Sequence, residues 1–441
     1  MASRDTGDAV NERLVAAIFE RAASHRYDPA VYNEEDERAF ECCRILFSKD
    51  YNCQVVSNCE NRSAHYPAKL IIPVKENTGI AEQEPIPGQQ SSDDSSRSFQ
   101  AGLYENMFKS SQACRMNKRF PVPTILWNGK YLSRTGSLDV LSVATDMDET
   151  LKQEGSQASD FIFQINIATA AFFMRNMKFF SEIKMDVALL EYLDVNYICD
   201  LRVRDTSKSF PNFADSCEAY QKYYVGFTTV HMPYPGIGYF RKYHNLRRPK
   251  LLSCDLDKVS PPRYELALAD IDCTTLFQTD LKKYERWSLH DITLNYLLVL
   301  QTYLTSDTLP RRGILLHCIA GQDRTPLFVT LLRLSFWADD LMHESLNPLE
   351  MLYLTVTYDW YMFGHDLTEC LDKGYEIMHF CYNMLDRISS DRFSVRKADE
   401  PAARARFIPC CPTVTDRKRK LTEVKKLFLK FYARIERRPS Q

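Results

Sequence analysis

The sequence predicts an α/β fold with a central mixed sheet flanked by helices, and two observations in its second half carry that prediction. First, residues 196–203 and 227–236 have strand character, and they are followed by a long helical pattern over 284–304. Second, the apolar stretch 312–318 leads directly into another helical pattern that begins at Arg324. Strands that alternate with helices form sheets covered by helices on both faces. We therefore expect one such domain over residues 160–395.

The first half of the chain predicts a smaller α+β unit. Residues 1–35 are expected to be a helical segment, and residues 36–135 a separate unit. Within the latter, residues 76–98 are rich in Pro, Gly, Ser and acidic residues, which predicts a mobile loop because such a composition cannot form a core. A second polar stretch, ending at Asp160, marks the expected boundary with the larger domain. Helical spacing occurs at 11–24 and 34–48, and short strands are predicted at 51–57, 68–74, 122–127 and 129–133.

Composition indicates a globular protein with a cytoplasmic location. The chain has 441 residues, of which 45% are hydrophobic, enough to bury a large core. It contains no apolar run of about 18 residues, and the first ten residues lack the basic and apolar regions of a signal peptide. The 14 cysteines are scattered without CxxC pairs, which favours reduced thiols over a disulfide framework. No metal or cofactor is expected, and the oligomeric state is left open.

Positive charge is concentrated at the end of the sequence. Residues 401–441 hold twelve Lys and Arg against three Asp and Glu, although the net charge of the chain is only −2. A nucleic-acid-binding protein usually carries such charge on its folded body, so we set nucleic acid aside as a partner. Residues 396–441 are expected to be a basic linker and an amphipathic helix, whose segment 421–438 has two equally favoured interpretations. In the first interpretation the segment lies on an anionic membrane, and in the second it docks on the rest of the protein.

The stretch "HCIAGQDRTP", residues 317–326, predicts a phosphate-binding loop. It joins a buried strand to a helix, Gly321 permits a concave backbone, and Pro326 suits the first turn of the helix. The backbone amides of Ile319, Ala320, Gly321 and Gln322, together with the helix N-terminus, can surround an anion. The same positive potential should lower the pKa of Cys318 and make it a nucleophilic thiolate.

The side chains after the loop complete the expected chemistry. Arg324 can bind two phosphate oxygens through its planar guanidinium. Asp323 is the nearest group that could protonate a leaving alkoxide. Thr325 could donate a hydrogen bond to the sulfur of Cys318, and His317 could orient the loop from behind. Each has an ordinary alternative: a small core cysteine, an aspartate that caps the helix, or a histidine satisfied in the core.

Context matters because the Cys-x5-Arg spacing alone is weak. Residues Cys381 to Arg387 have the same spacing, but they lack a glycine and lie within a helical pattern. We therefore expect this second occurrence to have no role in phosphate binding.

Several segments resemble the myotubularin-related inositol lipid phosphatases, and in particular a divergent branch of that family. The resemblance is carried by "HCIAGQDRTPLF", "YICDL", "PYPG", "LYLTVTYDWYMFGHDL" and "RFPVPTILWNGKYL", and it covers roughly residues 36–395. It implies a cysteine-dependent, tyrosine-phosphatase-like fold that removes the 3-phosphate from phosphatidylinositol 3-phosphate and the 3,5-bisphosphate without a metal. The family's nucleophile, phosphate-binding arginine and proposed general acid fall on Cys318, Arg324 and Asp323.

The sequence also departs from the family pattern. Gln322 stands where the family commonly has Trp, and Ala320 where mainstream members have Asp. After the Phe-Gly-His motif, positions that hold the 5-phosphate through arginines in mainstream members are Asp366 and Cys370. Because an acid there would repel a phosphate, we expect a preference for the monophosphate, unless the basic stretch 241–250 closes over the site.

The aromatic run before this motif is expected to be mainly core. Trp360, Tyr361 and Phe363 have the spacing of packing residues on a helix, whereas His365 and Asp359 are candidates to line the site. Two alternative functions remain open at this point. The loop chemistry equally suits a protein tyrosine or dual-specificity phosphatase, and the substitutions at 320 and 322 suit a pseudophosphatase that binds phosphoinositides without turnover.

Overall fold

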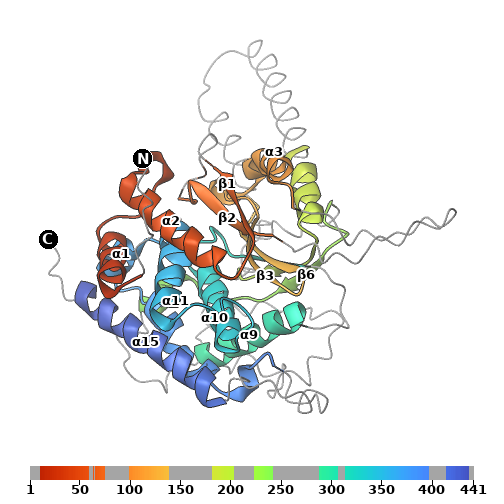
Figure 1. Ribbon diagram of the computed structural model, residues 1–441. Helices are drawn as coiled ribbons and strands as arrows, with labels where there is room; N and C mark the ends of the chain where they lie inside the picture. Colours follow the sequence, from red (N-terminus) through yellow and green to blue (C-terminus); the bar gives the residue numbers. More distant parts are fainter. Residues whose placement is uncertain are drawn as a thin grey trace, which may run out of the picture.

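The computed structural model describes residues 10–58, 63, 65–74, 99–138, 181–202, 223–241, 288–305, 313–396 and 414–436 (Figure 1). The expected mobile loop at 76–98, the boundary at Asp160 and nearly all of the basic stretch 241–250 lie outside these residues. Among the described helices, none is long and apolar enough to cross a membrane.

The described residues form a central sheet of five strands in the order β3-β4-β7-β5-β6. β4, β7, β5 and β6 are parallel neighbours, and β3 pairs antiparallel with β4, which gives the expected mixed sheet. All five residues of the central strand β7 are buried, as expected for a strand with parallel neighbours on both sides. The strands are β3 (Val122–Trp127), β4 (Lys130–Thr135), β5 (Val195–Asp200), β6 (Thr228–His231) and β7 (Gly313–His317).

This strand order corrects the predicted domain boundaries. Residues 36–135 were assigned to a unit of their own, yet β3 and β4 belong to the same sheet as β5, β6 and β7. Within the described part of the chain, only β1 (Cys53–Ser57) and β2 (Lys69–Pro73) form a separate two-stranded sheet. The prediction failed because local periodicity identifies a strand without revealing which distant strand it pairs with.

Helices cover the sheet and also join the two ends of the chain. α9 (Leu289–Thr305) contacts the strands β4 and β7. α10 (Arg324–Ala338) contacts the strands β3 and β7. α1 (Glu12–Ser24) contacts α11 (Pro348–Leu354), α12 (Leu367–Lys373) and α15 (Val414–Glu436). The expected N-terminal helical segment is therefore part of the main body. Further helices are α2 (Glu34–Ser48), α3 (Ala101–Ser111), α13 (Ile377–Asn383) and α14 (Leu385–Ile388).

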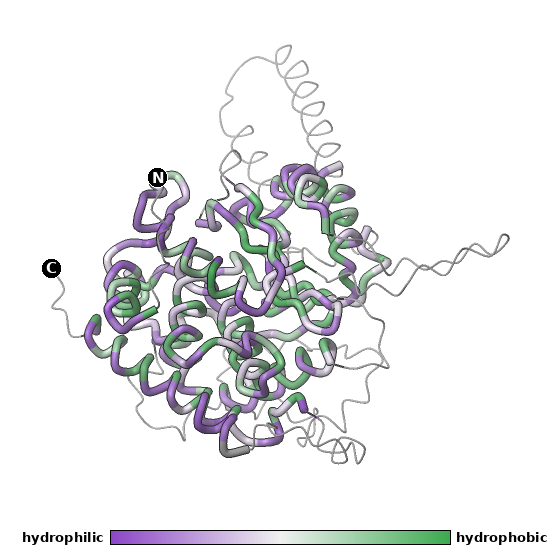
Figure 2. The backbone as a smooth tube through the Cα atoms, viewed as in Figure 1, coloured by the Kyte–Doolittle hydropathy of each residue, from purple (hydrophilic) through white to green (hydrophobic). Residues whose placement is uncertain are grey.

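The C-terminal amphipathic helix docks on the protein. Hydrophobic and hydrophilic residues alternate along its length (Figure 2). The ring of Phe428 stacks on Tyr382 with centroids 4.0 Å apart and lies 5.7 Å from Phe19 of α1. The apolar face is thus covered by the body and cannot at the same time insert into a bilayer. Its fully buried members are Leu421, Val424, Phe428, Phe431, Tyr432 and Ile435.

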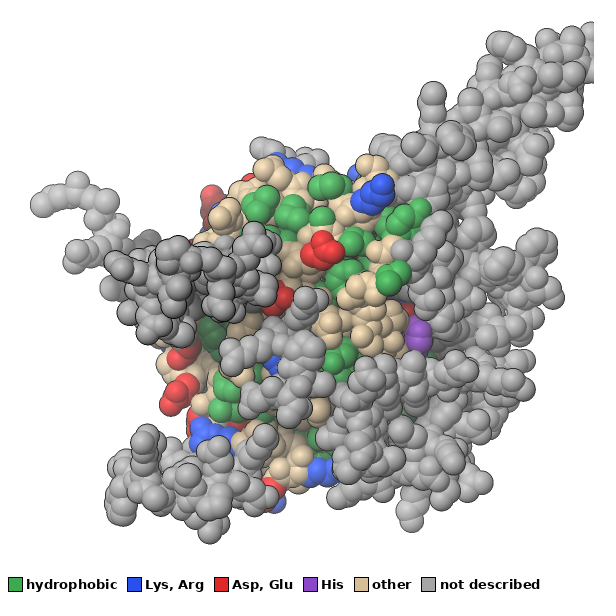
Figure 3. All heavy atoms as spheres, turned by 90° about the vertical axis from the view of Figure 1, so that its right-hand side faces the viewer, with side chains coloured by type: hydrophobic (Ala, Val, Ile, Leu, Met, Phe, Trp, Pro, Cys, Tyr) green, Lys and Arg blue, Asp and Glu red, His purple; other side chains and the backbone are tan. Residues whose placement is uncertain are grey.

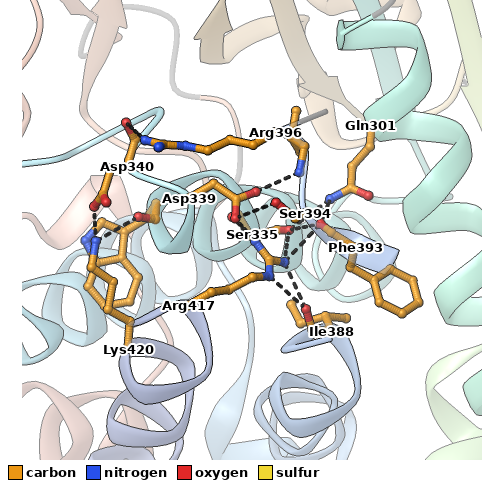
Figure 4. A network of polar contacts seen from close by, with 12 residues as sticks. Gln301, Ser335, Asp339, Asp340, Ile388, Phe393, Ser394, Arg396, Arg417 and Lys420 are labelled. Carbon is orange, nitrogen blue, oxygen red and sulfur yellow. Dashed lines mark hydrogen bonds and ion pairs between the residues drawn. The ribbon is translucent and has the colours of Figure 1, made fainter. Parts of the chain in front are cut away.

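A buried arginine fixes the start of this helix. Arg417 of α15 lies 2.6 Å from the carboxylate of Asp339, and its guanidinium also donates to the carbonyls of Ser335 and Ile388 (Figure 4). Lys420, one turn further on, pairs with Asp340. These polar contacts, added to the apolar face, make the docked position specific.

Charged side chains are mixed on the face seen in Figure 3. The described Lys, Arg, Asp and Glu side chains there are interspersed with apolar ones rather than gathered into a single charged patch.

Candidate active site

Cys318 follows directly after β7, at the carboxyl end of the parallel strands. Its Sγ accepts a hydrogen bond from the backbone N–H of Gly321 at 3.2 Å and one from the hydroxyl of Thr325 at 3.3 Å. Burial alone would raise the pKa of the thiol, but the positive charge of Arg324 and the bond from Thr325 outweigh burial, so the pKa lies below its ordinary value. The surroundings of Cys318 therefore favour the thiolate form, in contrast to those of a buried core cysteine.

Gly321 is required by the close approach of the loop to β4. Its φ of +67° lies in the left-handed region, and a Cβ at this position would lie 2.7 Å from the carbonyl oxygen of Thr135. The backbone N–H of Ser137 also donates to the carbonyl of Ile319 at 2.9 Å. The end of β4 thus forms one wall behind the loop.

Arg324, the first residue of α10, is held by two other strand ends. Its Nη1 donates to the carbonyl of Leu201, just after β5, at 2.9 Å and to that of Tyr234, after β6, at 3.1 Å. Only 7% of the residue is exposed. β5 ends at Asp200, earlier than the predicted 203, and β6 ends at His231, before the two prolines of "MPYPG", so both of these carbonyls lie just beyond the strand ends.

Asp323 interacts with a histidine instead of capping the helix. It is the N-cap residue of α10, yet its side chain makes no capping hydrogen bond. Its Oδ1 lies 2.8 Å from Nδ1 of His365. Burial acts to lower the pKa of His365, but Cys370 and the hydrogen bond to Asp323 raise it to about 10. The His365 ring is therefore protonated and positively charged beside the Asp323 carboxylate at neutral pH. The alternative that Asp323 merely caps the helix does not hold.

His317 supports the loop from inside the sheet. It is fully buried, with Nδ1 3.7 Å from Oδ1 of Asp200 and 3.4 Å from the carbonyl of Cys318. Burial lowers the pKa of His317 to about 4, so the ring is neutral near pH 7. Asp200 is itself bound by Arg202, which donates from Nε at 2.9 Å. This buried position, in contact with Asp200 and the Cys318 carbonyl, agrees with a supporting role for His317.

The other loop residues differ in exposure. Ile319 is half exposed, whereas Ala320 and Gln322 are partly buried. The side-chain nitrogen of Gln322 is buried and has no hydrogen-bond partner among the described residues. Such an unsatisfied polar atom is unusual in a folded protein, which makes Gln322 a candidate for contact with a bound ligand.

The segment after α11 packs as expected and supplies His365. Residues Thr355–Met362 form a π-helix, a form that is often found at functional sites. Trp360, Tyr361 and Phe363 are buried, which confirms that they are core residues. Asp359 is fully buried and bound by Arg333 at 2.8 Å, so it does not line the site as we had suggested.

The second Cys-x5-Arg occurrence lies in helices, as predicted. Cys381 is buried in α13, Arg387 is exposed in α14, and burial raises the pKa of the Cys381 thiol well above its ordinary value. This cysteine is not activated.

Three arginines near the loop were missed by the sequence analysis. Arg119 precedes β3 and Arg134 lies in β4, and both are buried against Phe363. Arg26, from the N-terminal segment, donates to the carbonyl of Gly364 at 3.0 Å and lies 3.9 Å from Asp366. The available signal was that arginines flank apolar strands in "RFPVPTILWNGKYLSR". It was not recognised because those strands were assigned to a separate unit.

The amino-acid sequence is similar to those of two curated phosphatases. The chain is 33% identical over 371 residues to human phosphatidylinositol-3,5-bisphosphate 3-phosphatase MTMR14 and 32% identical over 380 residues to its mouse counterpart. The resemblance to the myotubularin-related proteins is confirmed. The aligned part is 82% of this chain, and the chain spans about half the length of these curated relatives, 55% in each case. No family model matches the sequence.

Proposed function

We propose that the chain is a phosphoinositide 3-phosphatase that acts through a phosphocysteine intermediate on a tyrosine-phosphatase-like fold. One observation carries the proposal: the Sγ of Cys318 accepts hydrogen bonds from Gly321 and Thr325 in a loop that ends at the N-terminus of α10. The similarity to two proteins named as phosphatidylinositol-3,5-bisphosphate 3-phosphatases supports the substrate class.

In the first step, the thiolate of Cys318 attacks the phosphorus of the 3-phosphate. A sulfur–phosphorus bond forms while the bond from phosphorus to the inositol oxygen breaks. Arg324 and the loop amides stabilise the charge on the non-bridging oxygens. The leaving alkoxide takes a proton from the Asp323–His365 pair, in which Asp323 is the group that can face the substrate because 27% of its side chain is exposed.

In the second step, water hydrolyses the phosphocysteine. The water oxygen bonds to phosphorus, its proton passes to the Asp323–His365 pair, and the sulfur–phosphorus bond breaks to release inorganic phosphate and the thiolate. The hydroxyl of Thr325, already 3.3 Å from the sulfur, stabilises the departing thiolate. The cycle thus ends with every group in its starting protonation state.

The headgroup preference depends on the charges around His365. Asp366 was expected to repel a 5-phosphate, but Arg26 lies 3.9 Å from its carboxylate and offsets part of that charge. We therefore propose that both the monophosphate and the 3,5-bisphosphate are substrates, with a smaller preference for the monophosphate than the sequence alone implied. Such lipids lie in a bilayer. We propose a cytoplasmic protein that contacts membranes peripherally through a surface other than the apolar face of α15.

The first test measures phosphate release from phosphatidylinositol 3-phosphate in liposomes, for the wild type and Cys318→Ser. The Cys381→Ser variant is a matched control, because Cys381 shares the spacing to an arginine but lies in a helix. Release should be lost with Cys318→Ser and kept with Cys381→Ser. Release from a phosphotyrosine peptide but not from the lipid would favour a protein phosphatase. Lipid binding without any release would favour a pseudophosphatase, with Gln322 as the first residue to examine.

A further inference from the structure

Arg134 of β4 bonds directly to the backbone of the phosphate-binding loop. Its Nη2 donates to the carbonyl of Gly321 at 3.0 Å, and its Nη1 donates to the carbonyl of Asp359 at 2.8 Å. The guanidinium carbon lies 3.9 Å from the centre of the Phe363 ring. The side chain is 1% exposed. Arg134 therefore ties the loop to the π-helix through two carbonyl groups and an aromatic face.

The bond to Gly321 bears on the direction of the loop amides. In a loop that surrounds an anion, the N–H groups must point inward, and the carbonyls must then point outward and find other donors. The structure provides such donors for two loop carbonyls: Arg134 for Gly321 and the backbone of Ser137 for Ile319. The N–H of Gly321, on the other side of the same residue, points to the sulfur of Cys318.

Arg119 is a second buried arginine beside the loop. Its Nη2 donates to the carbonyl of Phe363, and its guanidinium carbon lies 4.5 Å from the Tyr66 ring centre. Its Nε and Nη1 are buried and have no hydrogen-bond partner among the described residues. Burial lowers the pKa of Arg119 and of Arg134 to about 10, an effect that the charge of Cys318 opposes in both cases. Both remain cationic at neutral pH.

The balance of charge favours a doubly negative ligand. The carboxylates nearest the loop are already paired, Asp323 with His365 and Asp359 with Arg333. Among the described residues, no carboxylate forms an ion pair with Arg119, Arg134 or Arg324, so their positive charge is offset there only by a thiolate at Cys318. A buried cation without a counterion is costly, and a phosphate dianion would remove that cost.

We propose that Arg134 is a positioning residue that holds the loop 318–324 with its amides inward, and that Arg134 and Arg119 supply the fixed positive charge that a bound phosphate dianion neutralises. The proposal extends the proposed phosphatase function, and it rests on that function only in taking phosphate as the natural anion. A purely structural role for Arg134 would predict lower stability with unchanged anion binding.

The test uses tungstate, an oxyanion shaped like phosphate that is not turned over. Calorimetry gives its affinity, and the pH dependence of Cys318 alkylation by iodoacetate, followed by mass spectrometry of the Cys318 peptide, reports the thiolate. We expect Arg134→Met to weaken tungstate at least about tenfold, the usual effect of losing a hydrogen bond to a charged group, and to shift alkylation to higher pH. Arg134→Lys keeps the charge but loses the planar guanidinium that reaches both carbonyls at once, so its effect should be intermediate. Arg119→Met should weaken tungstate while leaving the Gly321 bond in place.

Arg417→Met is the matched control for loss of a buried arginine. Arg417 is also buried, but its partners Asp339, Ser335 and Ile388 belong to the α15 docking site. This variant should unfold at a lower temperature and still bind tungstate like the wild type below its transition. If Arg134→Met does not fold, Arg134→Lys decides the result by the same two measurements.

The outcomes separate this inference from the proposed function. Tungstate affinity and alkylation profiles of the Arg134 variants within twofold of the wild type would overturn the inference, as would a wild type that does not bind tungstate. A wild type that binds tungstate, with weaker binding in the Arg134 variants, supports the inference even if no phosphate is released from lipid. That last result would contradict the proposed function alone.

Discussion

Buried arginines occur in two contrasting surroundings in this protein. At the α15 docking site, Arg417 lies 2.6 Å from the carboxylate of Asp339, and in α10, Arg333 lies 2.8 Å from that of Asp359. Beside the phosphate-binding loop, Arg119 and Arg134 instead donate to carbonyl groups and lie over aromatic rings. The charges of Arg417 and Arg333 are balanced by carboxylates, whereas no described carboxylate pairs with Arg119 or Arg134.

The contrast shows that burial alone does not reveal the role of a charged residue. An arginine paired with a carboxylate contributes to a fixed contact, and its removal leaves a buried negative charge behind. An arginine held only by neutral groups keeps a positive potential that can act on a ligand. The two classes should therefore respond differently to substitution, one in stability and the other in anion binding or rate.

Arg324 provides the largest expected effect on activity. Arg324→Lys keeps a positive charge but loses the planar group that can bind two phosphate oxygens, and the rate of phosphate release should fall about 100-fold or more. Arg387→Lys is the matched control, since Arg387 is exposed and follows Cys381 at the same spacing. Phosphate release from lipid vesicles measures both. A fall of less than about threefold with Arg324→Lys would remove this arginine from phosphate binding.

Arg417 should show the opposite pattern, a change in stability without a change in chemistry. Arg417→Met leaves Asp339 buried without its cation, which should lower the free energy of unfolding by about 3 kcal/mol. Adding Asp339→Asn removes the stranded charge, so the double variant should recover part of that loss. Denaturant unfolding of the three variants and the wild type measures the effect. The pairing of Arg417 with Asp339 would be contradicted if the double variant loses more free energy of unfolding than the two single variants lose together.

The Asp323–His365 pair should make stability depend on pH. The pKa of His365 is raised to about 10 in the folded protein from an ordinary 6.5, so between these values the folded state binds more protons than the unfolded state. The stabilisation is fully present below about pH 6.5 and is lost as pH rises towards about 10. We expect unfolding measurements to show a decline of about 1.5–3 kcal/mol over this range, the scale of a hydrogen bond to a charged group. The His365→Gln variant should show almost none of this decline. An equal decline in that variant would show that another group causes the pH dependence.

Arg26 should have the smallest effect, limited to headgroup choice. Arg26→Gln removes the charge that offsets Asp366, so turnover of the 3,5-bisphosphate should fall two- to fivefold relative to the monophosphate, as expected for a partly exposed ion pair. Rates on the two lipids in matched vesicles give the ratio. An unchanged ratio would show that the 5-phosphate does not approach this residue.

Much of the local structure followed from the sequence. The helices expected at 11–24 and 34–48 are found at Glu12–Ser24 and Glu34–Ser48, because each begins after an asparagine whose side chain accepts from the first turn. The loop was predictable because a buried strand, a glycine and a helix N-terminus follow one another without interruption. Cys318, Asp323 and Arg324 are all local to that signal.

The remainder depended on contacts between distant parts of the sequence. Nothing in "KYLSRT" indicates that β4 pairs with β7, or that Arg134 then lies against Gly321. The same limit applies to α15, since an apolar stripe bordered by lysines suits a bilayer and a protein surface equally well. The structure shows that α15 packs on the protein, because Tyr382 and Phe19 cover Phe428.

The wall that β4 forms behind the loop has a consequence for how the site comes into being. Arg134 and Thr135 are synthesised long before Cys318, yet both contact Gly321 in the folded protein. A ribosome-bound chain that ends before residue 318 holds the wall without the nucleophile, and a fragment that starts at residue 139 holds the nucleophile without the wall. Neither piece contains a complete loop environment, so the phosphate-binding region is not a transplantable module. It can be assembled only after both halves have been made.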